Sequence, residues 1–139
     1  MNNKKYFITI GILGASAVAL GAFGAHGLKN QLSTGLITAD QLNGFDTGVK
    51  YQMYHTLAML LLIALQDKLP LKFLKLTWNF FLVGIVLFSG SLYFLTTRNI
   101  TGMEFLTFLG PVTPLGGISF MIGWVMLIIG AFRNGSNKT

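Results

Sequence analysis

Long apolar runs separated by short polar stretches dominate the chain. The runs cover residues 6–25, 49–65, 74–95 and 115–132. A helix needs about 20 predominantly apolar residues to cross a bilayer, and each run is close to that length. We therefore predict an all-α polytopic membrane protein whose four transmembrane helices form an antiparallel bundle. The first run also has the flanking lysines and small residues of a cleaved signal peptide, but its length favours a retained helix.

Two connections carry helix-start signals. Thr38 followed by Gln41 fits a capping box, in which each side chain bonds to the other residue's backbone. Apolar residues follow at helical spacing, so we expect a partly amphipathic connection between the first two spans. Before the fourth run, Thr113 and Pro114 predict another start, with Thr113 as the N-cap and the proline in the first turn.

The composition agrees with a membrane protein. The chain has 139 residues, of which 53% are hydrophobic and 10% are charged, and its mean hydropathy is +0.64. An average soluble domain carries about 25% charged residues. Four spans leave too little chain for a second folded unit, so we expect residues 1–139 to form a single membrane domain. The absence of cysteine excludes disulfides, thiolate catalysis and cysteine metal sites.

The basic residues predict an orientation. The net charge is +6, but basic residues beside apolar spans set orientation and meet anionic lipid, so we expect no nucleic-acid partner. Four spans with both termini inside leave only Lys29, Lys50 and Arg98 outside, and they place on the inner side Lys4, Lys5, Lys68, Lys72, Lys75, Arg133 and Lys138. This excess predicts cytoplasmic N- and C-termini. Within the inner loop, Lys68, Lys72 and Lys75 either contact lipid headgroups or serve orientation alone.

Small residues form stripes on two of the predicted helices. The first stripe comprises Gly14, Ala17, Gly21 and Gly24, and the second comprises Gly116, Gly123 and Gly130. Helices in lipid associate through close backbone approach, which small residues allow. The stripes therefore predict packing faces, either within one bundle or between subunits of a homo-oligomer.

Polar side chains gather in the outer half of the predicted bundle. Unpaired donors and acceptors are costly in lipid, so such groups need partners. The predicted cluster combines Tyr51, Gln52 and His55, which share a helix face, with His26, Ser89, Ser91 and Thr113 at similar depth. Three interpretations stay open: hydrogen bonds that lock the helices together, a site for a small molecule or lipid headgroup, and metal or haem ligation by the two histidines.

Reactive chemistry is scarce. The acidic residues all lie outside the deep parts of the predicted spans, whereas proton-coupled carriers place a carboxylate there. The sequence has no zinc-protease motif, and no serine has a base and an orienting acid in its sequence context. We therefore expect no enzyme activity, no catalytic residue, no metal and no cofactor.

Four sequence blocks resemble a known family. They are GAFGAHGL at residues 21–28, YQMYH at 51–55, FSGSLY at 88–93 and TPLGG at 113–117. From about residue 8 to 132 the chain resembles the membrane family called domain of unknown function 423, which includes the eukaryotic transmembrane protein 256. The resemblance implies a small polytopic protein of the bacterial cell membrane, and it brings no established reaction, substrate or cofactor.

The function expected from these features is non-enzymatic. Ample packing surface with little chemistry favours a membrane-organising, lipid-binding or partner-binding factor whose partners are membrane lipids and further copies of itself. The alternative is a small channel or carrier subunit that binds a small ligand in the outer polar cluster.

Overall fold

The computed structural model describes residues 3–135, which form an all-helical fold without strands in that range. In chain order the elements are α1 (Asn3–Phe23), η1 (Gly24–Leu28), α2 (Lys29–Ser33), α3 (Ala39–Ala64), α4 (Leu71–Gly84), η2 (Ile85–Ser89), α5 (Gly90–Thr101), η3 (Glu104–Leu109) and α6 (Val112–Gly135). The segments η1 and η2 are single wide π turns inside longer helical rods, and η3 is a 3-10 helix.

Local signals explain several helix ends. The capping box predicted at the start of α3 is confirmed, because the Thr38 hydroxyl accepts from the Gln41 amide and the Gln41 side chain accepts from the Thr38 amide. Gly102 ends α5 with a φ of 69°, a left-handed conformation that glycine adopts without a side-chain clash. The prediction of Thr113 as the N-cap of the last helix is wrong. α6 already begins at Val112, and the Thr113 hydroxyl instead bonds to Ser91 on another rod.

Within the described residues 3–135, three stretches are long and apolar enough to cross a membrane: Lys4–Ser33, Leu71–Thr101 and Glu104–Arg133. Each extends past the span predicted there, because helical structure continues beyond the apolar run into polar sequence. The span predicted at 49–65 covers the second part of α3 and the C-cap Leu65, and α3 is not among these three stretches. Lys50, Gln52 and His55 interrupt the apolar character of α3, so its place in the membrane remains a prediction.

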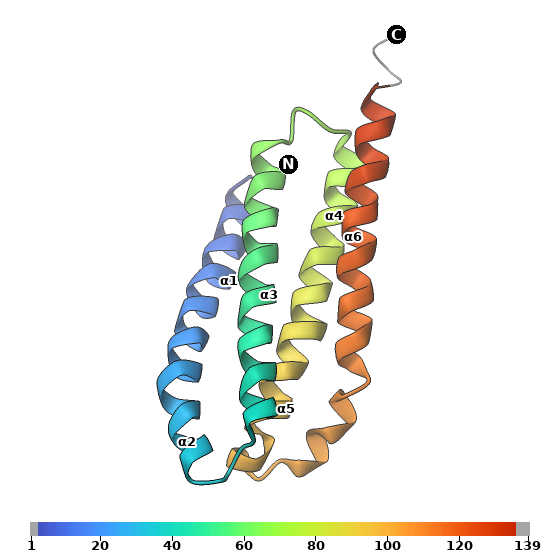
Figure 1. Ribbon diagram of the computed structural model, residues 1–139. Helices are drawn as coiled ribbons and strands as arrows, with labels where there is room; N and C mark the ends of the chain where they lie inside the picture. Colours follow the sequence, from blue (N-terminus) through green and yellow to red (C-terminus); the bar gives the residue numbers. More distant parts are fainter. Residues whose placement is uncertain (1–2, 136–139) are drawn as a thin grey trace.

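The rods lie side by side, with α1 and α6 at opposite edges (Figure 1). Close backbone contacts join α1 to α3, α3 to η2 and α5, and α4 and η2 to α6. Within residues 3–135, no such contact joins α6 to α1 or to α3. The backbones of α3 and α6 therefore flank the rod formed by α4 and η2 without touching each other.

The connections fall at two ends of the molecule (Figure 1). The start of α1, the α3–α4 connection and the end of α6 lie at one end, which we call the α3–α4 end. The α2–α3 connection and η3 lie at the other, the η3 end. The larger apolar core fills the space between α3 and α4 with buried residues such as Met59, Leu74 and Phe81, and Leu28, Ile37 and Phe45 form a smaller core.

Candidate functional site

The first small-residue stripe packs on α3. Ala17 is fully buried. A Cβ atom added at Gly24 would lie 3.2 Å from the Phe45 ring, and one added at Gly21 would lie 3.4 Å from Val49. Gly14 is looser, because its added Cβ would lie 3.9 Å from Thr56. The predicted stripe, which runs along α1 to the first residue of η1, is thus occupied by α3 of the same chain.

The second stripe receives phenylalanine side chains from α4 and η2. A Cβ added at Gly123 would lie 2.6 Å from the Phe81 ring, and one added at Gly130 would lie 2.8 Å from Phe73. At Gly116 the added atom would collide with the backbone of Phe88. These glycines therefore let α6 approach the rod more closely than any larger residue would allow.

Gln52 is the centre of a hydrogen-bond network that joins three helices. Its side chain is buried, with 4% of the residue exposed. The amide nitrogen donates to the Leu13 carbonyl and to the Ser16 hydroxyl, both at 2.8 Å, and the amide oxygen accepts from the Tyr93 hydroxyl at 2.9 Å. Both amide hydrogens and the amide oxygen are therefore used to tie α3 to α1 and α5.

His55 belongs to a second polar group, between α3 and α6. Its Nδ1 lies 2.8 Å from the Tyr51 carbonyl, and the Trp124 indole donates to its Nε2 at 3.3 Å. The ring stacks on Phe120 with centroids 3.6 Å apart and meets Phe81 edge to face. Both ring nitrogens of His55 are thus engaged by groups of the same chain.

The other predicted cluster members lie in separate places. Ser91 and Thr113 share a hydrogen bond of 2.6 Å between α5 and α6. Ser89 is fully buried in η2, where its hydroxyl forms no hydrogen bond of good geometry with a described residue and Tyr93 is the polar group that approaches it. His26 is exposed in η1, and the described residues offer its ring no hydrogen-bond partner. The structure therefore divides the predicted cluster into three groups and leaves His26 apart. The groups are Gln52 with nearby Ser89, Tyr51 with His55, and Ser91 with Thr113.

An aromatic groove opens beside His55, where α3 and α6 flank η2. Its volume is about 520 Å³. We define the aromatic groove by the side chains that line it, which are Tyr51, His55, Phe88, Pro114, Ile118, Phe120, Met121 and Trp124, together with Gly117. Trp124 is 46% exposed and Tyr51 is 40% exposed, so both rings face the surroundings of the protein as well as the groove.

The three lysines of the predicted inner loop lie at the α3–α4 end. Lys68 is in the α3–α4 connection, and Lys72 and Lys75 are in the first turns of α4. All three are exposed, which places their charges at the surface of the protein. Figure 1 shows that this end also holds the start of α1.

Some site residues were not anticipated. Ser16 and Tyr93 complete the Gln52 network, and Trp124 and Phe120 complete the surroundings of His55. Trp124 lies in the middle of an apolar run, which gives no sign of a polar partner 69 residues away. Among these residues, only Tyr93 could have been predicted from the sequence, because its depth in its helix is similar to that of Gln52.

Comparison with known proteins gives consistent matches over nearly the whole chain. Residues 20–117 match the family described as "Protein of unknown function (DUF423)". The chain is 44% identical over 132 residues to the UPF0382 membrane protein YwdK of Bacillus subtilis, covering 93% of this chain and 98% of the relative. It is 42% identical over 135 residues to a UPF0382 membrane protein of Haemophilus influenzae, with coverage of 96% and 98%.

A third relative is the UPF0382 inner membrane protein YgdD of Escherichia coli K12, which is 39% identical over 136 residues, with coverage of 96% of this chain and 93% of the relative. No solved structure matches the chain. The family match and these relatives confirm the resemblance carried by the four sequence blocks. The chain therefore belongs to the DUF423 family of membrane proteins, whose function is unknown and whose bacterial relatives are named membrane or inner membrane proteins.

Proposed function

We propose that this protein is a non-enzymatic, lipid-binding membrane protein that holds a lipid acyl chain in the aromatic groove. The observation that carries the proposal is the exposure of Trp124 and Tyr51 along a groove of about 520 Å³. The groove walls are almost entirely aromatic and aliphatic, and such surface in contact with the bilayer core is solvated by acyl chains. A groove between two helices holds a chain in more contacts than a flat helix face does.

The proposal includes four transmembrane helices in an antiparallel arrangement. α3 has 26 residues, which at a rise of about 1.5 Å each is long enough to cross the hydrocarbon core. Its polar Gln52 and His55 are buried, whereas Leu57 and Leu61 on the same helix are more than half exposed. An inward polar face and an outward apolar face are what a membrane requires of such a helix.

The paired contacts support opposite chain directions for neighbouring rods. On α1 and α3, Gly21 meets Val49 and Gly24 meets Phe45, so the residue numbers rise on one helix as they fall on the other. The same reversal holds where Gly116, Gly123 and Gly130 of α6 meet Phe88, Phe81 and Phe73. We accordingly propose one membrane domain with both termini in the cytoplasm, and inner lysines Lys68, Lys72 and Lys75 at the anionic headgroups.

The Gln52 network serves as a lock between helices in this proposal. A site for a transported ligand needs polar groups with unused hydrogen-bonding capacity, whereas the Gln52 side chain already makes three hydrogen bonds to its own chain. This favours the lipid-binding function over a small channel or carrier subunit. If the protein self-associates, we propose that it does so through its exposed edge faces, because its small-residue stripes are filled from within.

The proposal is tested by quenching of tryptophan fluorescence. Wild-type protein is placed in nanodiscs in which a small fraction of the lipids carries brominated acyl chains. The Trp124→Phe variant retains only Trp78, so its fluorescence is subtracted from that of the wild type to obtain the quenching of Trp124. We expect Trp124 to be quenched more than the bulk fraction of brominated chains predicts. In Gly117→Leu, whose side chain projects into the groove, quenching should return to the bulk value. Bulk-level quenching in the wild type would rule out a held chain.

A further inference from the structure

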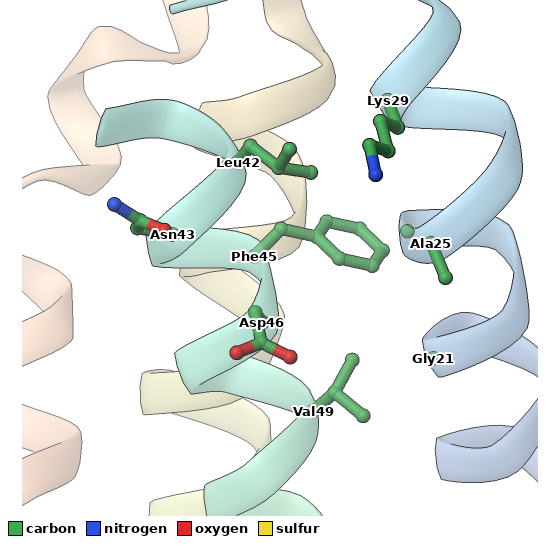
Figure 2. Close-up of a pocket in the computed structure, with 9 residues that line it drawn as sticks. Gly21, Ala25, Lys29, Leu42, Asn43, Phe45, Asp46 and Val49 are labelled. Carbon is green, nitrogen blue, oxygen red and sulfur yellow. The ribbon is translucent and has the colours of Figure 1, made fainter. Parts of the chain in front are cut away.

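A second pocket lies between α3 and the rod formed by α1, η1 and α2 (Figure 2). Its volume is about 240 Å³. We call it the α1–α3 cleft. Gly21 and Ala25 form one wall, Phe45 and Val49 form the other, and Lys29 and Asp46 add charged groups. The cleft exists because one wall carries almost no side chains, and it is separate from the aromatic groove, which uses α6.

Lys29 contributes a positive charge that the described part of the chain does not neutralise. Figure 2 shows its ammonium end turned toward the ring of Phe45, into the cleft. No acceptor among the described residues bonds to this ammonium group. Asp46 is already paired, because its Oδ2 lies 2.6 Å from Nζ of Lys50 on the next turn of α3. Lys50 does not line the cleft, but it offsets the charge of Asp46, so the side chains of Lys29, Asp46 and Lys50 together carry a formal charge of +1.

Beyond Lys29 the walls of the cleft are apolar except for the paired carboxylate of Asp46. Figure 2 shows Lys29 on the far side of Phe45 from Val49 and Gly21, and it shows Asp46 on the same side of Phe45 as Val49. The unneutralised charge therefore lies at one end of the cleft, and the mainly apolar part lies beyond it. Lys29 and Gly21 both belong to the stretch Lys4–Ser33, with Lys29 near its η3 end and Gly21 deeper within it. A ligand that satisfies both parts has an anionic head and an apolar chain, in the order in which a bilayer presents them.

We propose that the α1–α3 cleft binds an acidic phospholipid, with the headgroup phosphate at Lys29 and the start of one acyl chain between Ala25, Phe45 and Val49. Asp46 with its partner Lys50 borders the site and adds no net charge. The proposal shares with the proposed function the premise that α1 and α3 lie in the bilayer, but it does not use the aromatic groove. It assigns the protein a preference among lipid headgroups, which an apolar groove cannot supply.

Binding is measured by native mass spectrometry of purified protein in a neutral detergent, with short-chain phosphatidylglycerol and phosphatidylcholine of equal chain length. Wild type should bind the acidic lipid more tightly. Lys29→Gln should bind it about fivefold more weakly, the effect of removing the attraction of about one charge, with little change for phosphatidylcholine. Lys4→Gln, the same change at the exposed start of α1, is the matched control and should bind like wild type.

Two further arms identify the ligand chemistry. Ala25→Leu places a larger side chain in the cleft from an exposed position and should weaken binding of the acidic lipid while leaving the melting temperature without lipid unchanged. Glycerol phosphate, which has the headgroup charge without the chain, should not compete. Competition by glycerol phosphate at concentrations similar to those of the lipid would show a site for free phosphate and contradict the proposed acyl-chain contact. Tighter binding of an alkyl ammonium compound than of phosphatidylglycerol would contradict the proposed preference for a negative headgroup.

Equal affinity of wild type and Lys29→Gln for phosphatidylglycerol would overturn the cleft site. That result would leave the quenching of Trp124 unaffected, because Trp124 lies on α6 in the other pocket. Conversely, Gly117→Leu alters only the aromatic groove and should keep the headgroup preference. Each proposal can therefore be contradicted without contradicting the other.

Discussion

The indole nitrogen of Trp124 lies 3.3 Å from Nε2 of His55, while Nδ1 of the same imidazole lies 2.8 Å from the carbonyl oxygen of Tyr51. An indole N–H only donates and a carbonyl only accepts. The hydrogen bonds therefore assign His55 as a neutral ring with its proton on Nδ1. The arrangement satisfies both nitrogens and anchors a half-exposed tryptophan to α3.

This assignment predicts the behaviour of the Trp124→Phe variant. In wild type, 15N chemical shifts of His55 should report the neutral Nδ1-protonated tautomer. Trp124→Phe removes the donor to Nε2, and we expect an altered Nε2 shift and a loss of about 1 kcal/mol in the free energy of unfolding. Trp78→Phe is the control for the His55 spectrum, since Trp78 makes no hydrogen bond to His55. A wild-type ring protonated on Nε2 would contradict the assignment.

Gln52→Leu tests the lock between α1, α3 and α5. The variant loses three interhelical hydrogen bonds, and such bonds average about 0.6 kcal/mol each in membrane proteins, so unfolding in detergent should become about 2 kcal/mol easier. Asn43→Leu, at an exposed position of the same helix, should unfold like wild type. Unchanged stability of Gln52→Leu would contradict the role of Gln52 in holding the helices together, and it would favour Gln52 as a ligand-binding group.

Gly116→Ala tests the close approach of α6 to η2. The added methyl group collides with the backbone of Phe88, which cannot rotate away as a side chain can. We expect destabilisation of about 1–3 kcal/mol or more, typical of overpacking. Gly11→Ala is the matched control, because a Cβ there meets no atom within 4 Å, and this variant should be as stable as wild type. Equal melting temperatures for the two variants would contradict the packing.

The membrane topology can be checked with single cysteines, since the natural chain has none. Leu36→Cys and Ile100→Cys should react with a membrane-impermeant thiol reagent from outside the cell, and Pro70→Cys should react only after the membrane is opened. Asn137→Cys, which lies outside the described residues, should behave like Pro70→Cys. Labelling of Leu36→Cys and Pro70→Cys from the same side would show that α3 does not cross.

Metal and haem content provide a further test. Ligation through His55 requires a ring nitrogen that is already bonded, either to Tyr51 or to Trp124. We expect purified protein to show no Soret band and no stoichiometric metal by elemental analysis. A stoichiometric metal lost in His55→Ala would instead establish a metal protein.

The sequence alone determined the membrane class, the helical fold and the family. Apolar runs about as long as a bilayer is thick act locally, and the Thr38 capping box lies within four residues, so no tertiary information is needed for either. The stripes on the first and last helices were also visible, because small residues at helical spacing have few uses in lipid other than close packing.

Only the tertiary structure decided which polar groups meet. Depth along a helix placed His26, Gln52, His55 and Thr113 at similar levels, but rotation about the helix axes and the neighbours of each rod determine actual partners. His26 faces outward, Gln52 faces Ser16 and Tyr93, and His55 faces Trp124. Both pockets arise in the same way, since each requires side chains from rods whose relative rotation no local pattern encodes.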